Sequence, residues 1–461
     1  MREPCHEQLL TRSGAHRVRA ASLALALCSG LLALRLPAQE VLTLRKALEL
    51  AGKGSLSAVT SRSDEAVARE QTLQVRGTAY YPEITLQGGY TDQRDPSVLR
   101  FGLLQAPSNQ KSYWQYDFTV RQLLWDFGRR SEALKSSRTR EQAVRLAGSD
   151  SVRRAQAQVV ERYMSAMTVR AEKEVVAKRE KALSDHLRIV QDLYQQGMVA
   201  RNDLLRTEVA LRSVEDSARR LDDAYDTAIE ALNVAIGLPT DTKETLPGDF
   251  APPPALPWTL EHARSISVSN NGTVKALRAR YQALEEQLVS RRRDYYPNLV
   301  AQYDNAYQQN EYLVYPHMQS LFVGLSWNIF DGGVRAAKIR ESQADLERAH
   351  RELTEAERTA QLAASQAYRD FLEALRERKT AELNVQSSKE NFRIVEDQYK
   401  AGLARTTDVL DAESVLAQSR SDLVQKTYQA YTKQAALLAA MGEDLPGFYS
   451  RQGEPVAAEE K

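Results

Sequence analysis

Apolar residues recur along this chain with two different spacings, and the spacing changes at fixed points. Between Arg129 and Gln196, and again between Val334 and Lys400, they return every three or four positions, which predicts α-helix. At 1.5 Å per residue, each of these long helices would span about 100 Å. Shorter helical patterns cover 42–51, 57–79 and 258–293, with a break around 269–272, and a last one ends near Ala440.

The spacing becomes two residues directly after each of two Tyr-Tyr-Pro triplets. Pro82 and Pro297 end the preceding helices, because proline has no backbone N–H to donate. Within 83–125, apolar and polar positions alternate in two segments. This predicts a strand pair with one apolar and one polar face, joined by a loop at 94–112. A second strand pair is predicted within 298–330, with its last strand at 321–329.

Two short segments, 197–203 and 401–408, separate each long helix from a helix that returns. Gly197 and Gly402 supply a backbone that turns without a Cβ penalty. Oxygen-bearing side chains follow the second glycine, where they can accept hydrogen bonds from the free N–H groups of the returning helix: Thr406, Thr407 and Asp408. We therefore expect a sharp reversal at both segments.

The landmarks of the chain occur twice, at a common step of 205 residues. This step separates Tyr194 from Tyr399 and Asp126 from Asp331, and it also separates the two reversal glycines. An internal repeat of this kind indicates one architecture built twice. We divide the chain into a first repeat at 39–238, a proline-rich linker at 239–257, a second repeat at 258–441 and a flexible C-terminal tail at 442–461.

The first 38 residues have a different character from the rest. Arg17 and Arg19 precede an apolar run that ends in small residues near Ala38, which is typical of a secretory signal peptide. Both cysteines of the chain, Cys5 and Cys28, lie in this segment, so the exported protein would contain no thiol. Lipidation of Cys28 is the alternative use of this segment.

Composition and charge exclude several classes of function. The chain has 62 Lys+Arg against 61 Asp+Glu, so a nucleic-acid partner is not indicated. A mean hydropathy of −0.50 and the lack of an internal apolar run of about 20 residues exclude a multi-helix membrane protein. The six histidines show no metal-ligand spacing, and no nucleophile–base set or phosphate-binding loop is present. We expect no enzyme activity, no metal and no cofactor.

The helix lengths predict how each repeat packs. Two short helices laid end to end match one long helix, so we expect them to lie beside it as a left-handed coiled coil. The strand pair would lie at one end, the reversal at the other and the linker near mid-length. Four strands with one apolar face are too few to close a barrel, and an open sheet in lipid would leave unpaired edges. Several copies would therefore have to pool their strands.

Aromatic residues gather where the predicted strands meet the helices. Such residues form girdles at the surfaces of membranes. We assign this role to Tyr80, Tyr81, Trp125, Tyr295, Tyr296 and Trp327. The alternative is that they fill the core of a soluble protein.

These features, taken in order, resemble those of the TolC-like outer membrane efflux channels over essentially the whole mature length. The resemblance rests on the signal peptide, the duplication, the Tyr-Tyr-Pro triplets, the Asp-Gly-type turns and the segment from Gly402 to Ala412. It implies a mainly α fold with a small antiparallel β part. Duplicated long helical hairpins would form an α-barrel, and four strands per chain would contribute to a twelve-stranded barrel in a homotrimer.

The resemblance also implies a function, a location and partners. The chain would be a passive conduit in the outer membrane, in contact with its lipid, and would extend into the periplasm. It would work with a periplasmic adaptor (membrane fusion) protein and an inner-membrane pump of RND, ABC or MFS type. Drug efflux, metal efflux and type I protein secretion all stay open. The alternative from composition alone is a structural periplasmic coiled-coil protein without a pore.

The resemblance assigns a channel gate to the second reversal. Asp408 and Asp411 fall where acidic residues ring the closed periplasmic entrance, and Tyr399 matches a tyrosine that helps to hold it shut. The arginine that the family places two residues after the glycine is Ala404 here, which leaves the latch unassigned. In the first copy only Asp203 is kept. The alternative is that these aspartates simply favour a helix N-terminus.

Apolar residues lie at the tips of both reversals, where an isolated hairpin has no core to bury them. We interpret these tips as contacts for the adaptor, and local packing of the turn is the alternative. The residues are Gly197, Met198 and Val199 in the first reversal, and Gly402, Leu403 and Ala404 in the second.

Overall fold

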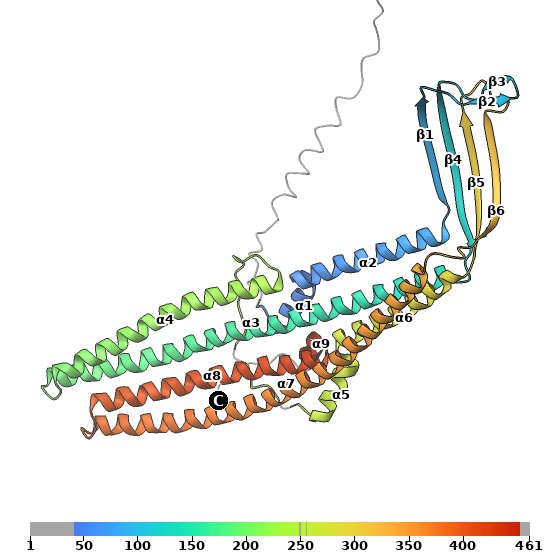
Figure 1. Ribbon diagram of the computed structural model, residues 1–461. Helices are drawn as coiled ribbons and strands as arrows, with labels where there is room; N and C mark the ends of the chain where they lie inside the picture. The colour runs from blue at the N-terminus through green and yellow to red at the C-terminus, as the bar shows by residue number, and fades with distance from the viewer. Residues whose placement is uncertain (1–40, 249, 255, 452–461) are drawn as a thin grey trace, which may run out of the picture.

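The protein is elongated, with two helical hairpins side by side and a four-stranded sheet at one end (Figure 1). The computed structural model describes residues 41–248, 250–254 and 256–451. The predicted signal peptide, with both cysteines, lies outside the described residues. Both reversals lie at the end of the molecule opposite the sheet.

The two hairpins have almost the same dimensions. The first consists of α3 (Arg129–Gln195) and α4 (Arg201–Ile236), and the second of α7 (Val334–Lys400) and α8 (Thr406–Met441). The two long helices are thus confirmed to within one residue of their predicted ends. Beyond α4, helix α2 (Leu56–Tyr80) packs along the remaining length of α3, so the predicted end-to-end pair is confirmed.

Shorter helices complete each repeat, and side-chain caps start the α-helices among them. They are α1 (Leu44–Gly54), α5 (Leu260–Asn270), α6 (Gly272–Arg292) and the 3₁₀ turn η1 (Arg293–Tyr295). The oxygen of Asn271 accepts a hydrogen bond from the N–H of Val274 at 3.2 Å. It starts α6 directly after α5, which confirms the break expected near 269–272. Equivalent caps start α1, α2 and α5 at Thr43, Ser55 and Thr259.

The sheet is antiparallel, with strand order β1-β4-β5-β6. Its strands are β1 (Glu83–Asp92), β4 (Ser112–Trp125), β5 (Asn298–Gln308) and β6 (His317–Ser326). The pairing of β4 with β5 joins the two repeats into one sheet. Within the described residues, β1 and β6 each pair along one side only.

Two details of the predicted strands are wrong. The segment 94–112 is not all loop, because β2 (Val98–Phe101) and β3 (Leu104–Pro107) form a two-stranded ribbon there. Gly102 adopts a left-handed conformation at the turn between them, which makes this tight reversal possible. The last strand covers His317–Ser326 rather than 321–329, so Trp327 lies just beyond it.

The register of the sheet separates its two faces. Leu86 lies opposite Phe118, and Tyr303 lies opposite Leu321, so one face carries the predicted apolar side chains. On the other face Thr119 donates a hydrogen bond to the Asp304 carboxylate at 2.9 Å. Large apolar side chains such as Leu86 and Leu321 are exposed in the single chain.

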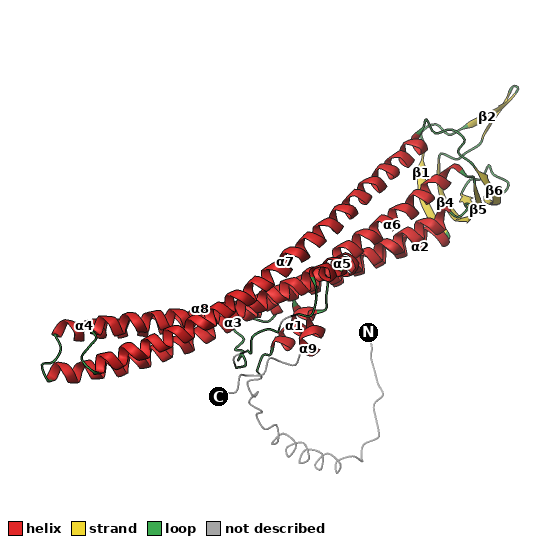
Figure 2. Cartoon of the chain, turned by 90° about the horizontal axis from the view of Figure 1, so that it is seen from below, coloured by secondary structure: helices red, strands yellow, loops and turns green. Residues whose placement is uncertain are grey.

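The main core lies near mid-length, where α1, the linker and a C-terminal helix pack on α3, α4 and α8 (Figure 2). The flexible tail predicted from residue 442 is therefore wrong for α9 (Leu445–Arg451), whose Leu445, Phe448 and Tyr449 are buried in this core. Their spacing puts them on one helical face, but seven residues are too few for periodicity to reveal a helix. The rest of the tail, 452–461, lies outside the described residues.

The ends of α1 and α4 meet in this core with almost no space between their backbones. Gly237 ends α4 in a left-handed conformation, and a Cβ atom there would overlap the carbonyl group of Gly54. Glycine is therefore required at Gly237 both by its backbone conformation and by the lack of space.

Candidate functional site

The two reversals present one exposed apolar side chain each. Met198 is 70% exposed and Leu403 is 81% exposed. Val199 and Ala404, predicted to be exposed as well, instead pack against an apolar cluster just inside the tips. Both side chains are half-buried there, and their assignment as adaptor contacts stays a prediction. Gly197 and Gly402 both adopt left-handed conformations, as expected.

The apolar cluster inside the tips joins the two hairpins. Val190 of α3 packs with Tyr399 of α7 and Val409 of α8. The imidazole of His186 meets the ring of Tyr399 edge-on, with 5.0 Å between the ring centroids. We call these four residues the tip joint. Tyr194, the repeat equivalent of Tyr399, is 39% exposed, so the duplication is not symmetric here.

Tyr399 is held in the tip joint from its own hairpin as well. The hydroxyl of Thr406 donates a hydrogen bond to the Tyr399 hydroxyl oxygen at 3.3 Å. Thr406 was predicted to cap α8, and this is wrong, because its side chain is buried against Tyr399. The N–H of Arg405 instead donates to the Asp408 carboxylate at 2.9 Å. Asp408 thus acts on the start of α8, although in a different way from that expected.

The predicted gate aspartates are placed differently from one another. Asp408 and Asp411 are both exposed on the first turns of α8, whereas Asp203 is half-buried at the start of α4. The structure therefore brings Tyr399 into the tip joint and leaves the side chains of Asp408 and Asp411 exposed in the single chain. Their role in a gate stays a prediction.

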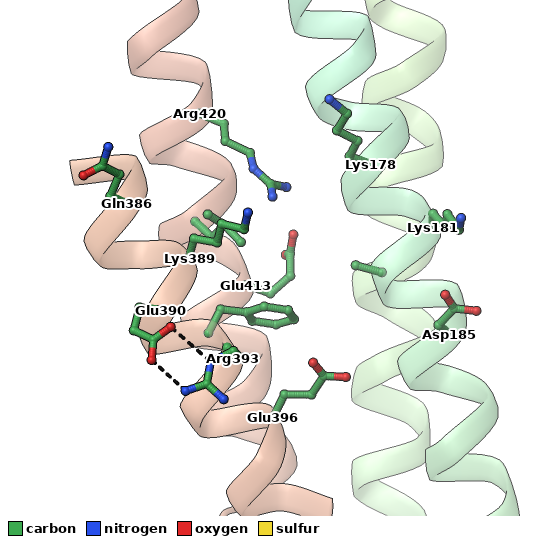
Figure 3. Close-up of a pocket in the computed structure, with 13 residues that line it drawn as sticks. Lys178, Lys181, Asp185, Gln386, Lys389, Glu390, Arg393, Glu396, Glu413 and Arg420 are labelled. Atoms are coloured by element: carbon green, nitrogen blue, oxygen red, sulfur yellow. Dashed lines mark hydrogen bonds and ion pairs between the residues drawn. The ribbon is translucent and has the colours of Figure 1, made fainter. Parts of the chain in front are cut away.

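A cleft of about 690 Å³ lies between the two hairpins beside the tip joint (Figure 3). Basic side chains from both hairpins line it, including Lys178, Lys389 and Arg420. At its base, Arg179 of α3 donates to the buried carboxylate of Glu413 on α8, at 3.0 Å from Nε to Oε2. Burial raises the pKa of Glu413, and Arg179 offsets part of that rise. Sequence reasoning missed this pair. Glu413 has Glu208 at its equivalent position and Arg179 has Asn384, but a contact between α3 and α8 does not follow from the repeat.

The junction between sheet and helices is the second region of interest. All six aromatic residues assigned there are exposed in the single chain, and so is the neighbouring Phe127. Their role at a membrane surface stays a prediction. Phe127 stacks on Tyr296 with 5.2 Å between ring centroids. The indole N–H of Trp327 donates to the Tyr295 carbonyl at 3.0 Å. The first contact joins the two repeats, and the second lies within the second repeat.

An arginine clamp, missed by the sequence reasoning, occurs in both repeats at this junction. Arg335 Nε donates to the Asp331 carboxylate at 2.8 Å, and its guanidinium lies over the Tyr295 ring at 4.8 Å. Arg130 repeats the arrangement 205 residues earlier, at 3.2 Å from Asp126 and 5.2 Å from the centre of the Tyr80 ring. The repeat step itself was the signal that could have revealed these two residues.

Two kinds of site are missing from the part of the chain that the structure describes. No group of three or more metal-ligating side chains is present among residues 41–248, 250–254 and 256–451. In the same residues, no helix combines the length and the hydrophobicity needed to span a bilayer.

Comparison with known proteins agrees with this architecture. The chain is 22% identical over 363 residues to the alkaline protease secretion protein AprF of Pseudomonas aeruginosa, covering 77% of this chain and 72% of AprF. It is 24% identical to the protein CyaE of Bordetella pertussis, covering 82% of this chain and 79% of CyaE. The outer membrane protein VceC of Vibrio cholerae shares the fold. Its TM-score is 0.71 at 16% identity, over 87% of this chain and 96% of VceC.

A family model settles the relationship. The model of the outer membrane efflux protein family matches residues 55–238 and 264–443, one segment in each repeat. The family and the fold are those of passive channels, so the alternative of a pore-less coiled-coil protein is set aside. The chain therefore belongs to the outer membrane efflux protein family, and it is an outer-membrane channel of an efflux or secretion system that extends into the periplasm.

Proposed function

We propose that three copies of this chain form one pore, with a barrel of pooled strands in the outer membrane and a helical tunnel below it. The observation that supports this proposal is the sheet of the single chain, which has two unpaired edges and an exposed apolar face. Unpaired backbone groups and an open sheet are not tolerated in lipid. Pairing β6 of each copy with β1 of the next removes both edges.

The entrance to this pore lies at the helical tips, and Asp408 and Asp411 line it. Both are exposed in the single chain, so three copies around one axis would gather six carboxylates. A ring of carboxylates attracts cations and repels anions. Asp203, half-buried at the other reversal, lies outside this ring.

Planar bilayer recordings test both the pore and its entrance. The purified protein should form cation-selective channels, and the double variant Asp408→Asn with Asp411→Asn should lose most of that selectivity. The matched control Asp203→Asn should keep it. Unchanged selectivity in the double variant would refute the acidic entrance, and a lack of channels altogether would refute the pore.

The exposed tips supply the contact with a periplasmic adaptor, which in turn links the channel to an inner-membrane pump. Met198 and Leu403 are single large apolar side chains in water, each at the outermost point of its hairpin. Cysteines placed at either position should crosslink to an adaptor in cells. Val234 is a matched control, because it is 62% exposed but lies on α4 far from the tips. Equal crosslinking at Val234 and Met198 would argue against a docking tip.

The cargo that we favour is protein. One relative carries the name of a protease secretion protein, and both relatives align over more than two thirds of their length. Deleting the gene should remove one or more proteins from the culture medium, and restoring the gene should return them. If the medium is unchanged while sensitivity to small toxic molecules rises, the cargo is instead a small molecule.

A further inference from the structure

His186 is a buried titratable side chain that the proposed pore leaves without a role. It is only 7% exposed, and its Nε2 atom has no hydrogen-bond partner among the described residues. A polar atom that is buried without a partner destabilises its surroundings, so its presence calls for an explanation. His186 also breaks the repeat, because the equivalent position holds the exposed Asn391.

The position of this ring makes it a contact between the two hairpins. His186 belongs to α3, and its edge-on partner Tyr399 belongs to α7. Val190, one turn closer to the tip on α3, packs in the same cluster as Val409 of α8. Any change in the charge of His186 therefore acts directly on the seam between the hairpins.

The charged groups around the ring are already engaged elsewhere. On α7, Glu396 is paired with Lys400 at 2.9 Å, and Arg393 is paired with Glu390 at 2.7 Å. On α8, Glu413 is held by Arg179. On α3, Asp185 is paired with Arg188, and on α4 the charged residues near the tip are exposed or half-exposed: Arg201, Asp203, Arg206 and Glu208. A charged imidazole in this place would be attracted by Glu396, whose carboxylate is already paired with Lys400.

We propose that His186 makes the tip joint an acid-sensitive catch, closed while the ring is neutral and released when the ring takes up a proton. This inference rests on the proposed pore with its entrance at the tips. A neutral imidazole can stay buried beside Tyr399. An imidazolium needs water or a carboxylate, and it reaches water when α3 and α7 separate.

The direction of the pH response follows from burial. Desolvation lowers the pKa of His186 below the ordinary value of 6.5, and the charge of Glu396 offsets part of this effect. The separated state thus binds the proton more tightly than the packed state. Packing is therefore strongest above pH 6.5 and weakens as the pH falls below it. Between pH 7.5 and 5.5 the equilibrium should move toward the separated state by at most about tenfold, a limit reached when the packed imidazole stays neutral over this range.

Glu413 cannot produce this response, because its sign is opposite. Its pKa is raised by burial, so the packed state binds that proton more tightly and acid favours packing through Glu413. If opening rises on acidification, the rise therefore comes from His186, because protonation of Glu413 would reduce opening.

Two measurements on the purified full-length protein test the inference. In planar bilayers, the open probability of the wild-type channel should rise from pH 7.5 to 5.5, by at most about tenfold. His186→Phe keeps an aromatic ring on Tyr399 without a titratable group, and its open probability should stay constant. His350→Gln removes an exposed histidine from α7 and should behave as the wild type. A wild-type channel that does not open in acid, or a His186→Phe channel that still does, would overturn the proposal.

Hydrogen exchange in detergent gives a second result that needs no conducting pore. Amides in 183–199 and 395–409 should be less protected at pH 5.5 in the wild type than in His186→Phe under the same conditions, by at most about tenfold. Equal protection in the two proteins would refute the inference. If the protein forms no channels but protection falls as expected, the proposed pore fails and the acid-sensitive catch stands.

Discussion

Replacing Arg179 with methionine should loosen the two hairpins at the tip. The change removes the partner of the Glu413 carboxylate, which lies 3.0 Å away and is only 6% exposed. Removing one partner of a fully buried ion pair costs about 3–5 kcal/mol, because the other charge stays buried without compensation. Methionine keeps most of the volume of the arginine stem, so the effect reports the lost charge and not a cavity.

Two features of the pair reduce this magnitude. Arg179 is 33% exposed, so water already screens part of the attraction. Arg420 also stabilises the charged form of Glu413 and remains in the variant. We therefore expect a loss of about 2 kcal/mol, which is about 30-fold in the equilibrium between packed and separated hairpins.

The loss should depend on pH in a defined direction. Burial already raises the pKa of Glu413, and removing Arg179 raises it further. A raised pKa in the packed state means that protonation stabilises packing. The loss in Arg179→Met should therefore be largest at neutral pH and shrink as the pH falls through the pKa that Glu413 has in the packed state.

Hydrogen exchange of amides in 175–190 and 409–424 measures this equilibrium directly. The control is Glu413→Gln added to Arg179→Met, which removes the orphaned charge and should restore most of the lost protection. If Arg179→Met exchanges as the wild type at pH 7.5, the pair contributes nothing to the seam. If the added Glu413→Gln restores nothing, the loss has a cause other than buried charge.

Three further substitutions examine other parts of the chain. Gly237→Ala should lower the melting temperature far more than Gly402→Ala. Both glycines are left-handed, but only Gly237 lies against another backbone segment, that of Gly54. Similar shifts in the two variants would contradict the close approach of Gly237 to Gly54. Phe448→Ala should lower the free energy of unfolding by about 3–5 kcal/mol, because this side chain is buried in the mid-length core. Thermal unfolding monitored by circular dichroism measures the change. A loss below about 1 kcal/mol would show that α9 is not packed on the core. Arg335→Ala should reduce the yield of correctly inserted protein, and Arg335→Lys should recover the yield only partly. Lysine cannot keep both the contact with the Asp331 carboxylate and the contact with the Tyr295 ring. Full recovery by lysine would show that charge alone matters.

The long helices and the sheet pairs could be predicted because their signals are local and repeated. The stretch from Arg129 has no proline and ends beside a glycine, so its length followed from the sequence within one residue. Period-two alternation likewise located β1 and β4. The ribbon of β2 and β3 was missed because four-residue strands show too little alternation to be recognised.

The site was predicted less completely than the fold. The duplication pointed to Tyr399, and the structure places this residue between the hairpins. It could not point to His186, Arg179 or Glu413, because each contacts a residue from the other hairpin, more than 200 positions away in the chain. The exposure of Met198 but not of Val199 depends on how the chain leaves the left-handed glycine, which a single sequence does not reveal.

The parity of the strand count fixes which side of the bilayer receives the helices. The chain enters the sheet from α2 and leaves it after β4 toward α3. It returns from α6 and leaves again after β6 toward α7, each time at the same end of the sheet. Gaining or losing one strand would send the second hairpin to the opposite side. Loops such as the one that carries the ribbon can therefore change length freely in evolution, but strands can be added or removed only in twos.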